Sequence, residues 1–154
     1  MSEEIQDQLE EQDVEQTEEQ PQEETSKEYS PIIGRELAAA SLAETAGRTK
    51  STGMCYFHVA NAVDKVIERF LYGGHAYMAA DQLAAKKDLF IEVSATSLSS
   101  LPAGAIVVWG KGNSKSGHIS IAQGDGTETS DFRGRQMLSH YGGGAARVFL
   151  PKGM

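Results

Sequence analysis

The chain has 154 residues, with 22 Asp and Glu against 14 Lys and Arg, which gives a formal net charge of -8. Residues 1–30 hold twelve acidic residues and one lysine, whereas residues 31–154 carry a net charge of +3. The acidic start argues against a nucleic-acid-binding arm, and no apolar run approaches the ~20 residues that cross a bilayer, so we expect neither nucleic-acid binding nor membrane insertion.

Residues 1–30 are rich in Glu and Gln and poor in aromatic and branched side chains. Such a segment buries too little apolar surface to offset its ordering entropy, so we expect a disordered acidic tail, with contact to another protein left open. Residues 31–154 fit a single compact domain, with its core at about 50–151. No basic stretch followed by apolar residues opens the chain, so no secretory signal peptide is expected.

Helical patterns fill the first half of the domain. Ser30 and Pro31 suit a helix entry, and the Ala- and Leu-rich residues 35–45 favour a helix. Apolar residues at helical spacing predict an amphipathic helix that begins near position 55, is capped by Ser51 or Thr52 and ends at 73–74, where two glycines stand. Residues 76–87 predict another short helix.

Strand patterns fill the second half. The apolar run 105–109 is typical of a strand buried on both faces. In residues 118–122, isoleucines alternate with other residues, which predicts a strand with one apolar face. An Asp-Gly turn at 123–127 predicts a hairpin to a strand at 128–132, and residues 146–151 predict a last strand. Helices followed by antiparallel strands indicate an α+β fold.

The single cysteine, Cys55, falls in the first turn of the predicted amphipathic helix. Unpaired N–H groups at a helix start favour a thiolate and can stabilise an oxyanion, so Cys55 is a candidate nucleophile. The alternative is a buried, inert cysteine. One cysteine forms no internal disulfide, and the four histidines show no zinc-ligand spacing around it, so no metal or cofactor is expected.

His118 is the best candidate for the base, because it opens a strand directly after a Gly-rich turn and lies on the strand face opposite Ile119 and Ile121. A surface histidine is the alternative. Of the other histidines, His58 suits packing or capping, His75 follows two glycines in a predicted loop, and His140, before the Gly-rich loop, suits the surface.

An acidic residue is expected to orient the imidazole. Glu128 and Asp131 follow in the next predicted strand and, three residues apart, should lie on opposite faces. Only one should therefore face His118. Glu128 is favoured and Asp131 is the competitor, with solvated hairpin charge as the alternative for both.

Residues 53–151 resemble a CHAP domain (cysteine, histidine-dependent amidohydrolase/peptidase) of the NlpC-like papain-fold hydrolases. The similar stretches stand in order along the chain: GMCYFHVANAV, GGHAYMAADQLA, LPAGAIVVWGKGNSKSGHISIA, ETSDF and RVFLP. The resemblance implies a papain-like fold in which N-terminal helices pack on a small antiparallel sheet.

The resemblance further implies cleavage of an amide bond in the peptide of peptidoglycan, by an N-acetylmuramoyl-L-alanine amidase or an endopeptidase, through a thioester on Cys55. His118 would then shuttle the proton and Glu128 would orient it. Without a signal peptide, a phage-encoded or virion-associated enzyme is expected, present in the virion or host cytoplasm before release and acting in the periplasm or cell wall. Two alternatives stay open: a papain-like deamidase or protease acting on a protein, and an inactive virion structural protein.

Overall fold

The computed structural model describes residues 28–153, so the acidic tail predicted for residues 1–30 lies almost wholly outside the described part. Three α-helices come first in this part: α2 (Pro31–Thr45), α3 (Cys55–Val66) and α4 (Ala79–Ala85), the last continuing the 3-10 turn Ala76–Met78. Six strands follow: β1 (Phe90–Val93), β2 (Ile106–Trp109), β3 (His118–Ala122), β4 (Thr127–Thr129), β5 (Arg133–Arg135) and β6 (Ala146–Pro151).

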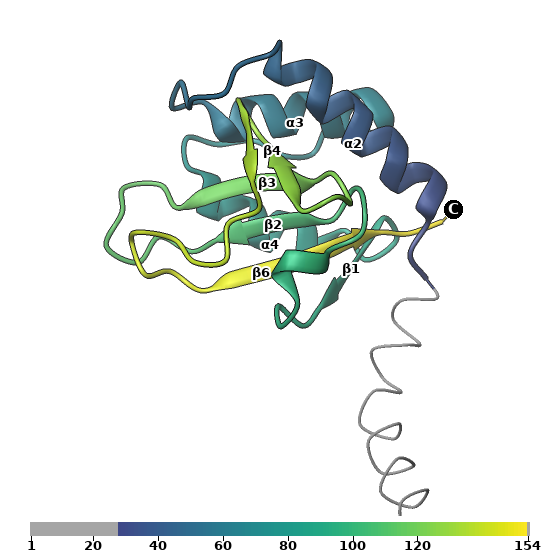
Figure 1. Cartoon of the computed structure of the whole chain (residues 1–154). Coiled ribbons are helices and arrows are strands. Elements are labelled where there is room, and N and C mark those ends of the chain that lie inside the picture. The colour runs from purple at the N-terminus through teal and green to yellow at the C-terminus, as the bar shows by residue number, and fades with distance from the viewer. Residues whose placement is uncertain (1–27, 154) are drawn as a thin grey trace, which may run out of the picture.

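The strands form one antiparallel sheet in the order β1-β6-β2-β3-β4-β5 (Figure 1). Its centre is β2, which pairs with β3 on one side and β6 on the other and is buried throughout. The register sets Trp109 opposite His118, so the predicted base opens its strand beside the last residue of the central strand. The predicted papain-like α+β class, with helices ahead of an antiparallel sheet, is confirmed.

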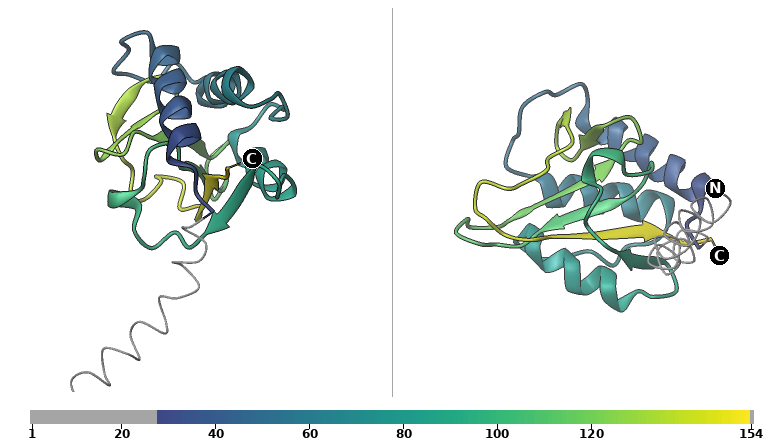
Figure 2. Two further views of the ribbon diagram at one scale, coloured as in Figure 1. Left: turned by 90° about the vertical axis from the view of Figure 1, so that its right-hand side faces the viewer. Right: turned by 60° about the horizontal axis from the view of Figure 1, so that its bottom comes forward.

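The core lies between the helices and one sheet face. Val59 and Val63 of α3 are fully buried against Ile119 and Ile121 of β3, and each such side chain contributes about 1.5–3 kcal/mol by burial. Helices α2 and α3 lie side by side over this face (Figures 1 and 2). Alternate residues of the strands form a second apolar cluster on the opposite face, under the segment that carries Leu98 and Leu101.

The start of α2 follows its sequence signals. Ser30 caps the helix by accepting the Ile33 N–H at 3.1 Å, and Pro31 occupies the first helical position. The Ser30 N–H donates to the Pro151 carbonyl, so the two ends of the described chain meet (Figure 2). Within residues 28–153, no helix combines the length and apolar character needed to cross a membrane.

Helix α3 is shorter than predicted. It begins at Cys55 but ends at Val66, well before the Gly pair at 73–74, and neither Ser51 nor Thr52 caps it. Leaving the helix early lets the chain turn back, so that Leu71 becomes buried and Phe70 packs on Phe90 at a centroid separation of 6.0 Å. Tertiary burial therefore outweighs the local helical pattern.

The strand predictions differ from the structure at the sheet edges. The strand predicted for 128–132 is β4, Thr127–Thr129, because the chain turns at Ser130, whose N–H donates to the Phe132 carbonyl. The edge strands β1 and β5 were not predicted. They have four and three residues, and β5 (RGR) has no apolar alternation that could have indicated it.

Candidate active site

Cys55 is the first residue of α3 and is partly buried. Met54, at the cap position, makes no side-chain capping bond to the helix. The first N–H groups of a helix have no partner inside the helix and carry partial positive charge. The thiol therefore stands where backbone donors can stabilise negative charge on sulfur or on a bound oxyanion.

His118 stands at the start of β3, with a side chain that is 12% exposed. Gly117 precedes it with φ +68°, and a side chain at Gly117 would collide with the backbone oxygen of Trp109. The turn before His118, the first residue of β3, therefore requires glycine at position 117. The His118 Nε2 lies 2.9 Å from Glu128 Oε2, and the side chain also interacts with Cys55. With Nε2 engaged by the carboxylate, Nδ1 is left for the thiol.

The pKa of His118 is raised from 6.5 to about 9. Burial disfavours the imidazolium, but hydrogen bonding to Cys55 and Glu128 and their negative charges outweigh it. An imidazolium next to a sulfur is the arrangement that keeps a thiolate paired with its proton donor.

Glu128 is only 2% exposed, and both of its carboxylate oxygens have hydrogen-bond partners. Its Oε1 accepts from the Gln136 side-chain amide at 2.9 Å and from the Met137 N–H at 2.8 Å, which leaves Oε2 for His118. The carboxylate is therefore held in one orientation by donors outside the catalytic candidates, and it in turn orients the imidazole.

Asp131, the other acidic candidate, is fully buried and faces a different partner. Its Oδ2 accepts from the N–H groups of Thr52 and Met54 and from the hydroxyls of Ser51 and Thr52. Burial raises its pKa, but these donors outweigh burial and lower the pKa to about 2. Asp131 thus holds the loop that leads into Cys55, and the hydroxyls of Ser51 and Thr52, which were predicted to cap the helix, donate to Asp131 instead.

His140 differs from its prediction as an exposed loop residue, because it is only 7% exposed. Its ring lies parallel to that of His118, with centroids 6.3 Å apart and an interplanar angle of 9°, and it also stacks on Trp109. Its Nδ1 accepts the Gly142 N–H at 3.2 Å. Burial and the charge of His118 lower the pKa of His140. His140 therefore stacks on the His118 ring as a neutral imidazole. Its spacing in the sequence carries no signal of this stacking.

The two remaining histidines, His58 and His75, have other hydrogen-bond partners. The His58 Nδ1 lies 2.9 Å from Glu44 of α2, which agrees with a packing role for His58. The His75 Nδ1 lies 2.9 Å from the Ser116 hydroxyl. Among residues 28–153, no group of three or more His, Cys, Asp or Glu side chains is arranged to hold a metal ion.

A hollow of about 210 Å³ adjoins the thiol. It is bounded by the start of α3, the segment after α3 and the turn before His118, and its lining includes Cys55, Phe57, Gly73 and Ser116. A carbonyl group in this hollow would meet the sulfur and the first N–H groups of α3. The structure thus brings Cys55 and Glu128 into contact with His118, with Cys55 lining the hollow and Asp131 holding the loop before it.

No protein-family model matches the chain, and no curated protein matches its sequence. The fold is similar to a chain of the type VI native effector–immunity complex Tae3–Tai3 from Ralstonia pickettii, with a TM-score of 0.57, 19% identity, and coverage of 75% of this chain and 96% of that one. The selenomethionine form of that complex gives a TM-score of 0.55 and 22% identity, covering 73% and 98%. At such identities the similarity establishes a shared fold.

Proposed function

We propose that the protein hydrolyses an amide bond in the peptide of peptidoglycan through a thioester on Cys55. The observation that carries the proposal is the Cys55–His118–Glu128 arrangement, in which a thiol at a helix start meets an imidazole held by a buried carboxylate. The resemblance of residues 53–151 to CHAP domains supplies the substrate class. The fold shared with an effector from a type VI effector–immunity complex is compatible with it.

In the proposed first half-reaction, the Cys55 thiolate attacks the amide carbon and its electron pair forms the C–S bond. The carbonyl oxygen becomes an oxyanion, held by the Cys55 N–H and a neighbouring loop donor. The His118 imidazolium then gives its proton to the departing nitrogen as the C–N bond breaks. The products of this step are a free amine and an acyl-thioester.

In the second half-reaction, neutral His118 takes a proton from water, and the oxygen attacks the thioester carbon. The C–S bond breaks, the carboxylic acid leaves, and the thiolate–imidazolium pair is restored. Glu128 keeps the imidazole oriented throughout, and Asp131 acts as a positioning residue for the loop before Cys55, not as the partner of His118.

Purified sacculi and mass spectrometry of the released fragments test the proposal. We expect wild-type protein to release soluble fragments with new amino groups, and Cys55→Ala to release none. A new lactyl carboxylate would identify an amidase, and a newly exposed amine within the stem peptide would identify an endopeptidase. Intact sacculi together with Cys55-dependent deamidation or cleavage of a protein would favour the alternative enzyme class. Association with a phage particle stays a prediction from the sequence.

A further inference from the structure

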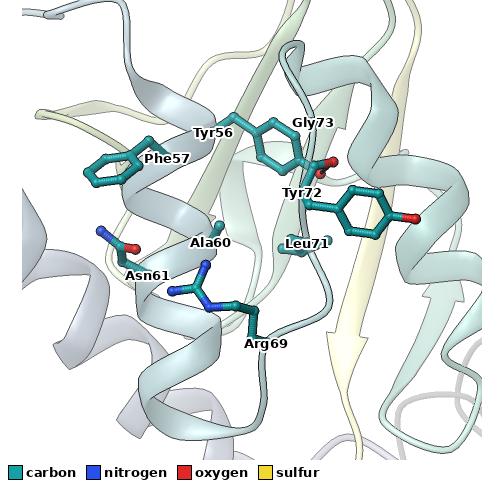
Figure 3. A pocket seen from close by; sticks show the side chains of 8 residues that line it. All are labelled: Tyr56, Phe57, Ala60, Asn61, Arg69, Leu71, Tyr72 and Gly73. Atoms are coloured by element: carbon teal, nitrogen blue, oxygen red, sulfur yellow. Dashed lines mark hydrogen bonds between the residues drawn. The ribbon is translucent and has the colours of Figure 1, made fainter.

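A second hollow, whose lining is drawn in Figure 3, lies along the side of α3 next to the hollow at Cys55. The two hollows share three lining residues, Tyr56, Phe57 and Gly73, so they adjoin, and together they are called the groove. The second hollow has a volume of about 220 Å³. One wall is α3 and the other is the segment 69–74, which runs beside the helix.

The outer wall of this groove is fixed by hydrogen bonds. The Gln82 side-chain amide donates to the Tyr72 carbonyl at 2.8 Å and accepts the Tyr72 N–H at 3.1 Å, as a neighbouring strand would. The Tyr56 hydroxyl, from the helix wall, donates to the same carbonyl at 2.8 Å. The groove is therefore pre-formed, and a ligand spends little free energy on ordering its walls.

The chemistry of the lining changes along the groove. Near Cys55, the exposed ring of Phe57 offers apolar contact, and Ala60 and buried Leu71 continue the apolar lining. At the far end stand Asn61 and Arg69, and the Arg69 side chain reaches from the segment after α3 back towards the helix (Figure 3). An apolar channel that ends at a guanidinium suits a chain with an acidic group at its end.

The Arg69 guanidinium has donors to offer a ligand. Its Nη2 donates to Asp64 at 2.9 Å, in a pair whose side chains are 61% and 39% exposed. An exposed pair of this kind contributes only ~0.2–1 kcal/mol, so a ligand carboxylate can share or replace it. The flat fork of five N–H donors binds carboxylates with two parallel hydrogen bonds.

The length of the groove sets the position of the acidic group in the ligand. Asn61 stands six positions after Cys55 in α3, which is about 9 Å along the helix axis at 1.5 Å per residue. An extended peptide advances roughly 3.3 Å per residue, so about 9 Å corresponds to two or three residues.

We propose that this groove is the substrate subsite on one side of the cut bond, and that Arg69 binds a free carboxylate two or three residues from the scissile amide. This inference rests on the proposed function and deepens it. A subsite that ends at Arg69 would favour peptides with a free carboxylate over the same peptides with a primary amide. Phe57 and Leu71 contact the intervening residues, and Arg69 is a specificity-determining residue that takes no part in the proton transfers.

A matched pair of soluble stem-peptide substrates tests the subsite, one with free carboxylates and one with each carboxylate converted to a primary amide. We expect wild-type protein to show a KM roughly tenfold lower for the acidic substrate, which corresponds to about 1.4 kcal/mol. Arg69→Gln should erase this preference by raising the KM of the acidic substrate to that of the amidated one. Arg133→Gln is the matched control, since Arg133 also forms an exposed pair with a carboxylate, on β5.

The outcomes separate the two proposals. If wild-type protein cleaves both substrates with the same KM, or if Arg69→Gln keeps the preference for the acidic one, the subsite assignment is overturned while the hydrolase proposal stands. If wild-type protein cleaves neither substrate and also leaves sacculi intact, the proposed function fails and the subsite fails with it. Erasure of the preference in Arg69→Gln but not in Arg133→Gln supports the subsite.

Discussion

The two sides of the candidate site are built by different means. On the sheet side, His118 and Glu128 come from neighbouring strands; Glu128 is paired with Ala122, and its carboxylate reaches the His118 imidazole at 2.9 Å. On the helix side, Cys55 follows an irregular loop that is held by Asp131. Glu128 and Asp131 stand three residues apart and are both buried, yet one contacts the His118 imidazole and the other holds the loop before Cys55. A single short hairpin thus carries both supports of the site.

The sheet side should show the larger effect. Replacing Glu128 by Gln removes the charge that holds the imidazolium but keeps the shape, so we expect kcat on sacculi fragments to fall roughly 10²-fold or more. Glu92→Gln is the matched control, because Glu92 also pairs with a cation, Arg147 at 2.7 Å, but at the opposite end of the sheet. Equal losses in the two variants would show that Glu128 has no special role.

The helix side should respond through both stability and rate. Asp131→Asn replaces an ionised acceptor of four donors, and we expect the free energy of unfolding to fall by about 2 kcal/mol, with kcat reduced roughly tenfold and KM little changed. Urea unfolding and steady-state kinetics measure the two effects. The control is Asp125→Asn, an exposed aspartate of the same hairpin that pairs with Arg133. An unchanged kcat in Asp131→Asn would show that the loop held by Asp131 does not position Cys55 for the reaction.

The pH dependence should differ between the two sides. The pKa of His118 is raised to about 9, so its contribution to stability is fully present below its ordinary value near 6.5 and is lost as the pH rises through about 9. The rate should fall over the same alkaline range, and Glu128→Gln should move that fall to lower pH. The pKa of Asp131 is lowered to about 2, so its contribution is present above its ordinary value near 3.8 and is lost as the pH falls towards 2.

The smallest effect is expected from a single donor of the loop. Thr52→Val keeps the backbone N–H that Asp131 accepts but removes the hydroxyl, which donates to the same oxygen at 2.9 Å. We expect a loss of about 1 kcal/mol in unfolding free energy and less than a threefold change in kcat. Thr96→Val, at an exposed position, should change neither quantity. A large loss of rate in Thr52→Val would mean that the other hydrogen bonds to Asp131 do not suffice to hold the loop before Cys55.

Sequence patterns are most informative about the sheet side, because side chains along a strand alternate between the two faces of the sheet. Alternation along residues 118–122 predicted that Ile119 and Ile121 face the core, and they lie in the core under the helices. The three-residue spacing of Glu128 and Asp131 predicted opposite faces of one strand, but β4 ends at Thr129 and the chain turns at Ser130, so the different partners of the two carboxylates come from this turn.

The helix side and the groove depend on contacts between distant residues. Asp131 binds a loop almost 80 residues earlier, and His140 stacks on His118 from a Gly-rich loop, and neither contact has a local pattern. The early end of α3 at Val66 follows from the burial of Leu71, which outweighs helical periodicity in residues 67–72. That same turn creates the wall of the groove with Arg69, so the sequence analysis could not have indicated it.

The most direct test of the account is an NMR titration of the His118 imidazole in the intact protein. We expect a His118 pKa of about 9 in the wild type, a clear decrease in both Glu128→Gln and Cys55→Ala, and no comparable change in Asp131→Asn. A wild-type pKa near 6.5 that neither Glu128→Gln nor Cys55→Ala alters would contradict the account, because His118 would then interact with neither the carboxylate nor the thiol.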